Sequence, residues 1–178
     1  MERDSLPDSE PKILAASGLK ASKGGSLKTV IALQGVRDIG KSQTIRTVDE
    51  LLRGKYSNAT VEHEHRTRAE LKIVLSINGV RIGIQSTGDN VSRIKESFEL
   101  FVSLGCEVII CAARTTGKSV SAVNELPDYE VVWLEQRAQS DPIERIFSNL
   151  EMARRIVEET EKSIARAKPA VLSHAAGR

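Results

Sequence analysis

One stretch of the chain decides how the rest is interpreted: Gly35-Val36-Arg37-Asp38-Ile39-Gly40-Lys41-Ser42. It fits the pattern G-x-x-x-x-G-K-[S/T], in which backbone N–H groups and a lysine surround a chain of phosphates. Glycines let such a loop turn tightly and approach a phosphate with no Cβ in the way. A helix that begins at the end of the loop directs its free N–H groups and its positive dipole end at the same anion.

The residues on either side of this stretch predict the elements that such a loop connects. Before it, Thr29-Val30-Ile31-Ala32-Leu33 is a short apolar run typical of a buried strand. After it, residues 43–53 predict a helix, because apolar side chains recur there at helical spacing, at Ile45, Val48, Leu51 and Leu52. The sequence therefore predicts a strand, a phosphate-binding loop and a helix.

The chemistry of the loop gives its residues separate roles. Lys41 is expected to reach the terminal phosphates of a nucleotide, and the Ser42 hydroxyl is expected to bind Mg²⁺. The full set of residues predicted to hold the phosphates is Gly35, Val36, Arg37, Asp38, Ile39, Gly40, Lys41, Ser42 and Gln43.

A second stretch, at residues 112–119, fits a looser version of the pattern with alanine in place of the first glycine. Only one convincing strand follows it, near residues 131–134, which is too little to build a covered parallel sheet. We therefore interpret 112–119 as an ordinary strand-to-helix loop at the same edge of the sheet. Arg114 and Lys118 in this loop are expected either to contact the ligand or to be exposed surface cations.

Residues 71–86 predict an antiparallel hairpin. Apolar and polar side chains alternate on both sides of Asn78-Gly79, and Asn-Gly favours a turn with positive φ at both central residues. The second strand of the hairpin is expected to run parallel to the strand at 29–33. The predicted fold class is therefore α/β, in three layers: a mostly parallel sheet that contains the hairpin, with helices on both faces.

The hairpin leads into Gln85-Ser86-Thr87-Gly88-Asp89-Asn90. Asp89 is the acid at this junction, where a carboxylate can hold Mg²⁺ or its water shell beside a γ-phosphate. The alternative is that Asp89 or Asn90 caps the helix that follows, and the two roles are compatible.

Two further segments carry local patterns. Residues 61–66 alternate acids and histidines, which in an extended strand would place Glu62 and Glu64 on one face and both histidines on the other. No third ligand is spaced to complete a metal site there, so a solvated edge strand or loop is favoured.

Asp141, Pro142 and Glu144 predict the start of a long helix. Its predicted sheet-covering face comprises Ile143, Ile146, Phe147, Leu150 and Val157.

Composition limits the possible classes of protein. The 178 residues are predicted to form one nucleotide-binding domain at 26–168, with a mobile leader at 1–25 and a flexible tail at 169–178. A net charge of +2 does not indicate a nucleic-acid partner, and the chain has no apolar run of membrane-spanning length. Cys106 and Cys111 lack metal-site spacing and are expected to be reduced core thiols, as in a cytoplasmic protein.

Through residues 35–42 the chain resembles the P-loop NTPase superfamily, and the predicted order of elements over 27–166 is similar to that of small GTPases. Small GTPases have D-x-x-G after the third strand and N-K-x-D after the next. Here Gln85-Ser86-Thr87-Gly88 keeps the glycine of the first motif but not its acid, and Ala113-Arg114-Thr115-Thr116 replaces the second. The resemblance implies a nucleoside triphosphate ligand, and the missing guanine-selecting aspartate favours ATP over GTP.

The resemblance also implies a reaction. Lys41, Asp89 and Arg114 are the expected catalytic residues, with Ser42 and Asp89 at the Mg²⁺, in a protein that hydrolyses ATP or transfers its γ-phosphate. One alternative is a small-molecule or nucleotide kinase whose acceptor is bound by residues 60–68 and 114–118. Another is a nucleotide-dependent switch, for ATP or GTP, that acts on a protein partner with little turnover. A protein partner or a homo-oligomer is compatible with each of these, and no membrane association is expected.

Overall fold

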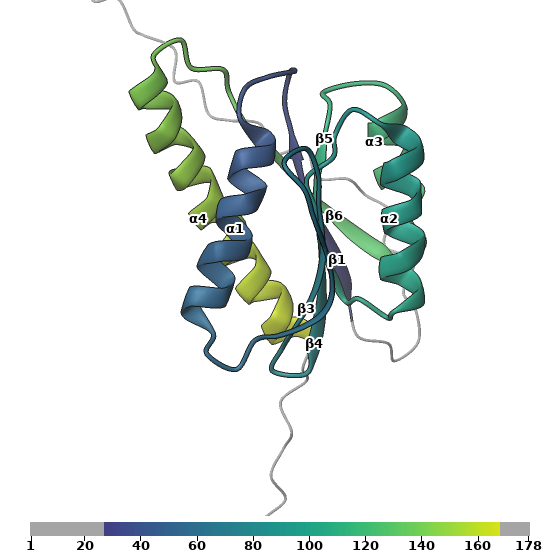
Figure 1. Cartoon of the computed structure of the whole chain (residues 1–178). Coiled ribbons are helices and arrows are strands. Elements are labelled where there is room, and N and C mark those ends of the chain that lie inside the picture. The colour runs from purple at the N-terminus through teal and green to yellow at the C-terminus, as the bar shows by residue number, and fades with distance from the viewer. Residues whose placement is uncertain (1–26, 168–178) are drawn as a thin grey trace, which may run out of the picture.

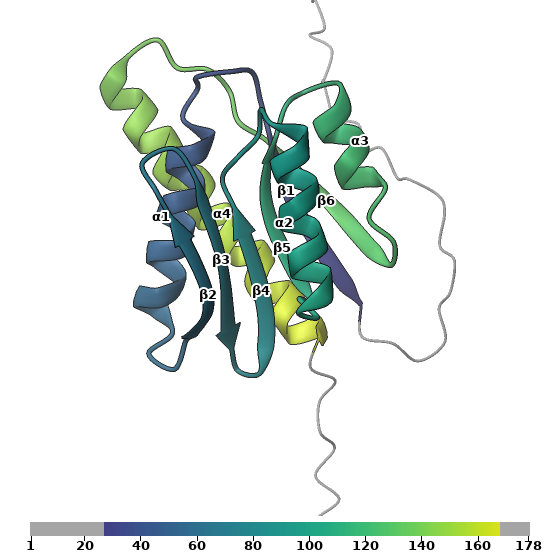
Figure 2. The ribbon, with the colours of Figure 1, turned by 45° about the vertical axis from the view of Figure 1, so that its right-hand side comes forward.

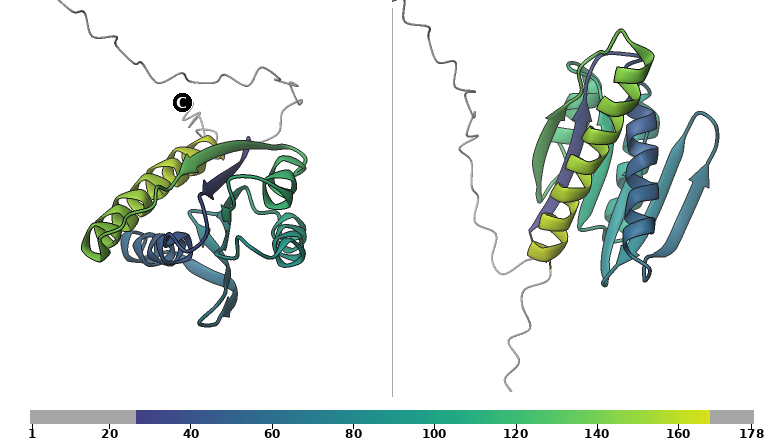
Figure 3. Two further views of the ribbon diagram at one scale, coloured as in Figure 1. Left: turned by 90° about the horizontal axis from the view of Figure 1, so that it is seen from above. Right: turned by 90° about the vertical axis from the view of Figure 1, so that its left-hand side faces the viewer.

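A six-stranded sheet lies between two pairs of helices in the computed structural model, which describes residues 27–167 (Figure 1). Helices α1 and α4 cover one face and helices α2 and α3 cover the other, as the view from above shows (Figure 3). The three-layer α/β class is therefore confirmed. The predicted leader at 1–25 and tail at 169–178 lie outside the described residues. The order of strands across the sheet is β2-β3-β4-β5-β1-β6.

Strand β1 (Lys28–Gln34) lies inside the sheet, between β5 (Val108–Ala113) and β6 (Tyr129–Glu135), and pairs with both in parallel. Its residues from Val30 to Leu33 are fully buried. A strand that is covered on both faces needs apolar side chains at successive positions, which explains why this run does not alternate.

The predicted hairpin is confirmed as β3 (Leu71–Ile77) and β4 (Val80–Gln85). Asn78 and Gly79 have φ of +54° and +80°, the positive values that the Asn-Gly pair predicts. Strand β4 is parallel to β5, and β5 is parallel to β1, so β4 runs in the predicted direction. Strand β5 lies between β4 and β1, and no local sequence pattern predicts this strand order.

Strand β2 (Thr60–Arg66) is the exposed edge strand that its polar sequence favours (Figure 2). The prediction that Glu62 and Glu64 share one face is wrong. The pairing with β3 shifts register between Val61 and His63, and this bulge moves the alternation by one position. Glu62 therefore contacts Arg81 at 2.7 Å, whereas Glu64 contacts Arg53 of α1 at 3.1 Å.

The four helices are α1 (Lys41–Lys55), α2 (Val91–Ser103), α3 (Lys118–Asn124) and α4 (Pro142–Ala167). Cys106 and Cys111 are free and buried in the apolar cluster beneath α2 and α3, as predicted, and burial raises the pKa of each thiol to about 12. None of the helices within residues 27–167 is long and apolar enough to cross a membrane.

The predicted buried face of α4 is only partly correct. Ile143, Ile146 and Phe147 are exposed, by 64%, 67% and 67%. Ile143 and Phe147 lie about a third of a turn or more from the middle of the buried face, whereas Ile146 is on that face, about five turns before the buried Ile164. The helix is also longer than the sheet: its 26 residues span about 39 Å, whereas a seven-residue strand spans about 23 Å. Its buried face includes Asn149, Met152, Ala153, Ile156 and Val157.

Packing of α2 on β4 predicts the effect of a single methyl group. A Cβ at Gly83 would lie 2.4 Å from Cγ of the buried Phe101 ring, so Gly83→Ala is expected to lower the free energy of unfolding by about 1–3 kcal/mol. Gly54 in α1 has open space around the same position, so Gly54→Ala is the control and should raise stability by about 0.5–1 kcal/mol. Equal urea midpoints for the two variants would contradict this packing.

Candidate functional site

The loop at residues 35–42 joins the carboxyl end of β1 to the first turn of α1 (Figure 1). Its shape requires two glycines. Gly40 has φ of +99°, and a Cβ there would lie 2.6 Å from the side-chain amide of Asn149. A Cβ at Gly35 would lie 2.4 Å from Cδ1 of Ile39. The loop therefore makes the tight turn that its sequence predicts, with the free N–H groups of α1 at its end.

A buried polar network holds this loop from below. Gln136, the residue after β6, donates from Nε2 to the Ile39 carbonyl at 3.1 Å and to Oδ1 of Asn149. Its Oε1 accepts a hydrogen bond from the Thr44 hydroxyl of α1 at 3.0 Å. Gln136 is 3% exposed and Asn149 8%, so the network joins β6, α4 and the loop away from water. Neither residue was predicted, although an asparagine on the buried face of a helix is a signal of such a role.

Lys41 is buried beneath the cavity that the loop helps to form. Its Nζ donates to the carbonyl oxygen of Gly35 at 2.8 Å and to that of Val36. No carboxylate among residues 27–167 forms an ion pair with it. Burial lowers the pKa of Lys41 below its ordinary value, and the charge of Asp89 opposes this shift. Lys41 is thus a largely desolvated cation held by neutral carbonyls, an environment that favours an arriving anion.

The carboxyl end of β4 lies beside the first turn of α1. The Ser42 hydroxyl donates to the carbonyl oxygen of Ser86 at 3.1 Å. The side chain of Asn90 accepts a hydrogen bond from the Arg93 N–H at 3.2 Å and is the N-cap of α2. Of the two residues that could cap α2, Asn90 is therefore the cap. The carboxylate of Asp89 pairs with Arg114 instead.

Asp89 contacts two arginines at the rim of the cavity. It accepts a hydrogen bond from Nε of Arg114 at 2.9 Å, and its other oxygen lies 3.8 Å from Nε of Arg37. Asp89 follows β4 and Arg114 follows β5, and the sequence predicts both as site residues. The structure brings these two side chains into contact. All three side chains are substantially exposed, so solvent weakens these ion pairs and they can exchange partners at little cost.

One cavity of about 310 Å³ collects most of these groups at the carboxyl edge of the sheet. Five of its lining residues were predicted: Asp38, Gly40, Lys41, Ser42 and Asp89. The other lining residues were not among the predicted site residues: Ser86, Gly88, Ala112 and Arg145. The predicted residues that do not line it are Gly35, Val36, Arg37, Ile39, Gln43 and Arg114.

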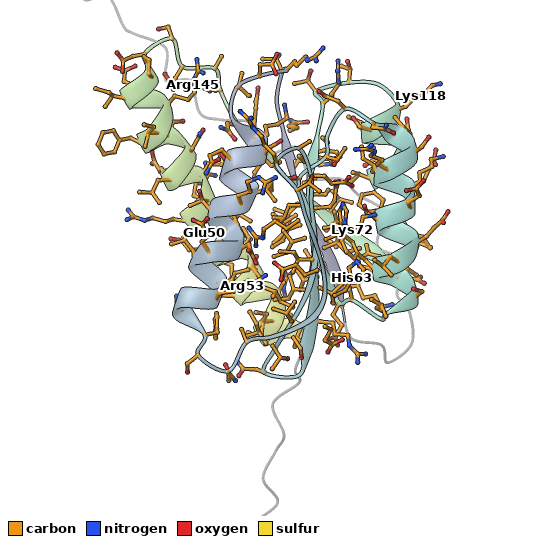
Figure 4. All side chains as sticks on the ribbon, viewed as in Figure 1. Glu50, Arg53, His63, Lys72, Lys118 and Arg145 are labelled. Atoms are coloured by element: carbon orange, nitrogen blue, oxygen red, sulfur yellow. The ribbon has the colours of Figure 1, made fainter. Side chains whose placement is uncertain are left out.

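The acid- and histidine-rich strand β2 is not part of this cavity. Figure 4 shows His63 and Arg53 in the lower half of the molecule, whereas Arg145 lies at the end that carries the 35–42 loop. Within residues 27–167, no group of three or more His, Cys, Asp or Glu side chains could hold a metal ion. The acids of β2 instead pair with arginines, which makes this edge a network of ion pairs.

Comparison with known proteins adds no assignment: no protein-family model matches the chain, and no curated protein is significantly similar to it. The interpretation of the site therefore depends on its residues and their geometry.

The buried amide of Gln136 should matter for folding. Gln136→Ala removes three hydrogen bonds and leaves the Asn149 side chain and the Ile39 carbonyl without the amide that they contact, whereas Thr44 keeps its bond to the Gly40 carbonyl; we expect a loss of about 2–4 kcal/mol in the free energy of unfolding. Gln43→Ala, at an exposed position of α1, is the control and should change stability by less than about 0.5 kcal/mol. A similar urea midpoint for both variants would show that the network does not hold the loop.

Proposed function

We propose that this protein binds Mg²⁺ and ATP in the 35–42 cavity as a P-loop NTPase and acts on the γ-phosphate. The observation that carries the proposal is the position of Lys41, a buried cation without a carboxylate partner in residues 27–167. The N-terminus of α1 adds a second source of positive potential at the same place. A chain of phosphates would supply the negative charge that both lack.

The oxygen donors of the cavity fit Mg²⁺. This ion prefers oxygen ligands, keeps several waters, and commonly binds through one or two carboxylates together with substrate phosphates. The Ser42 hydroxyl and the Asp89 carboxylate line the same cavity and would be its protein ligands. When bound, Mg²⁺ neutralises charge on the β- and γ-phosphates. Because phosphates complete such a site, it does not need a cluster of three protein ligands.

Rearrangement of the Asp89 ion pairs would prepare the site for the reaction. Asp89 accepts a hydrogen bond from Arg114 in the structure. A γ-phosphate would compete with Asp89 for this guanidinium, because a phosphate accepts charge-assisted hydrogen bonds from arginine. Asp89 would then be free to bind the metal or orient a nucleophile, while Lys41 and Arg114 stabilise charge on the transferred group.

A nucleotide-dependent switch is the second candidate, and the surface of α4 favours it. Ile143, Ile146 and Phe147 are exposed on the same two turns that carry Arg145 into the cavity. Exposed apolar groups of this size are typical of a protein-binding surface. The kinase alternative has less support, because no residue of 60–68 lines the cavity.

Nucleotide binding can be tested by thermal unfolding with Mg²⁺ and either ATP or GTP. ATP at a hundredfold its dissociation constant should stabilise the protein by about 2.7 kcal/mol, and Lys41→Ala should abolish this gain because the phosphates lose their buried cation. Lys118→Ala is the control, since Lys118 is the exposed lysine of the looser motif (Figure 4). Stabilisation that persists in Lys41→Ala, or that is lost in Lys118→Ala, would contradict the proposal. A larger gain with GTP would favour the switch.

Turnover separates the enzyme from the switch. If the protein hydrolyses ATP, Asp89→Asn should slow steady-state phosphate release by about 10- to 100-fold while ATP still binds, because the carboxylate acts mainly on the reaction. Asp128→Asn is the control: Asp128 is exposed, and asparagine accepts its φ of +66°. Native protein that retains bound nucleotide but releases no more phosphate than Lys41→Ala would exclude the hydrolase and leave the switch.

A further inference from the structure

Arg145 enters the cavity from the first turn of α4. The side chain is half-buried, and its Nη2 donates to the carbonyl oxygen of Gln139 at 3.0 Å. Its Nε is buried and has no hydrogen-bond partner. Among the described residues, three other buried side-chain atoms share this condition, on Thr29, Gln85 and Thr87, and none of them carries a full charge or lines the cavity.

The surroundings of Arg145 lack a counter-charge. Within residues 27–167, no carboxylate lies within ion-pair distance of its guanidinium, and a single backbone carbonyl satisfies one of its five N–H groups. A buried charged donor without an acceptor is costly, and the cost is removed when a ligand supplies the acceptor. Arginine is suited to phosphates in particular, because its planar fork can donate two parallel hydrogen bonds.

The order of strands determines which part of a nucleotide Arg145 can reach. Asp89 and Arg114 follow β4 and β5, on one side of β1 and its loop. The chain reaches Arg145 through β6, which pairs with the other edge of β1, and Arg145 lines the cavity from the start of α4 (Figure 4). If Asp89 and Arg114 act at the γ-phosphate, a phosphate chain that crosses the loop has its α- and β-phosphates on the side of Arg145.

We propose that Arg145 is a nucleotide-binding residue that contacts the phosphates nearest the nucleoside, through the buried Nε that has no hydrogen-bond partner among the described residues. This inference rests on the proposed function, since it assumes that the cavity holds a nucleotide. It gives the cavity a second lining cation beside Lys41, in addition to Arg114, which pairs with Asp89 at the rim. Because Arg145 and Asn149 are one turn apart on α4, the helix contacts both the ligand and the loop.

Titration calorimetry with Mg²⁺ and either ADP or ATP tests the inference. Arg145→Met keeps the apolar stem of the side chain and should weaken the binding of both nucleotides by the same factor, about 10- to 100-fold, because both contain the inner phosphates. Arg154→Met is the control, since Arg154 is an exposed arginine of the same helix with no partner among the described residues. It should change neither affinity more than about twofold. Arg114→Met should weaken ATP more than ADP.

Each alternative result has a distinct meaning. Unchanged affinity in Arg145→Met, with binding lost in Lys41→Ala, would overturn this inference and leave the proposed function intact. A loss confined to ATP would place Arg145 at the γ-phosphate and also overturn it. Failure of the native protein to bind either nucleotide would overturn both proposals.

A purely structural role for Arg145 is tested without ligand. If Arg145→Met melts well below Arg154→Met before any nucleotide is added, its weaker binding reflects a displaced loop at Gln139, and the inference is overturned. Arg145→Lys adds a second test that keeps the charge. It should bind both nucleotides with intermediate affinity, because lysine retains the attraction but lacks the fork. Affinity no better than that of Arg145→Met would contradict a contact with the phosphates.

Discussion

The contact between Gly40 and the amide of Asn149 is the constraint on which the site depends. Gly40 has the left-handed backbone that ends the loop and begins α1, and the amide fills the space that a Cβ would occupy. Gln136 holds this amide in place and also hydrogen-bonds the loop and Thr44. The loop therefore takes its shape from the residue after β6 and from α4 as well as from its own glycines. A buried network whose hydrogen bonds are satisfied holds the loop in a single conformation.

Strand direction explains why residues far apart in the sequence share one cavity. Strands β4, β5, β1 and β6 run parallel, so their carboxyl ends and the loops that follow them meet at the same edge of the sheet. The segment after β4 contributes Ser86 and Asp89, and β5 contributes Ala112. The connection after β6 leads to α4, whose Arg145 lines the same cavity. Strand β2 lies at the far side of the sheet, and its charged residues form ion pairs there instead.

Helix α4 connects the cavity to the surface. Its buried face covers the sheet and α1, its first turn carries Arg145 into the cavity, and its first two turns expose Ile143, Ile146 and Phe147. A ligand that contacts Arg145 would thus act on the same helix that supports the loop through Asn149. This arrangement provides a short physical route from the cavity to an apolar surface.

The sequence by itself determined the local elements: the buried strand, the 35–42 loop, the hairpin at Asn78-Gly79 and the helix that begins near Pro142. These depend on backbone conformation and on the period of apolar side chains, which are properties of neighbouring residues. Only the tertiary structure decided that β5 lies between β4 and β1, that Asp89 pairs with Arg114, that Gln136 and Asn149 support the loop, and that Arg145 lines the cavity. It also decided that a bulge separates Glu62 from Glu64 and that part of the apolar face of α4 is exposed. These features arise from contacts between distant segments, where burial and the length of one element relative to another override the local pattern.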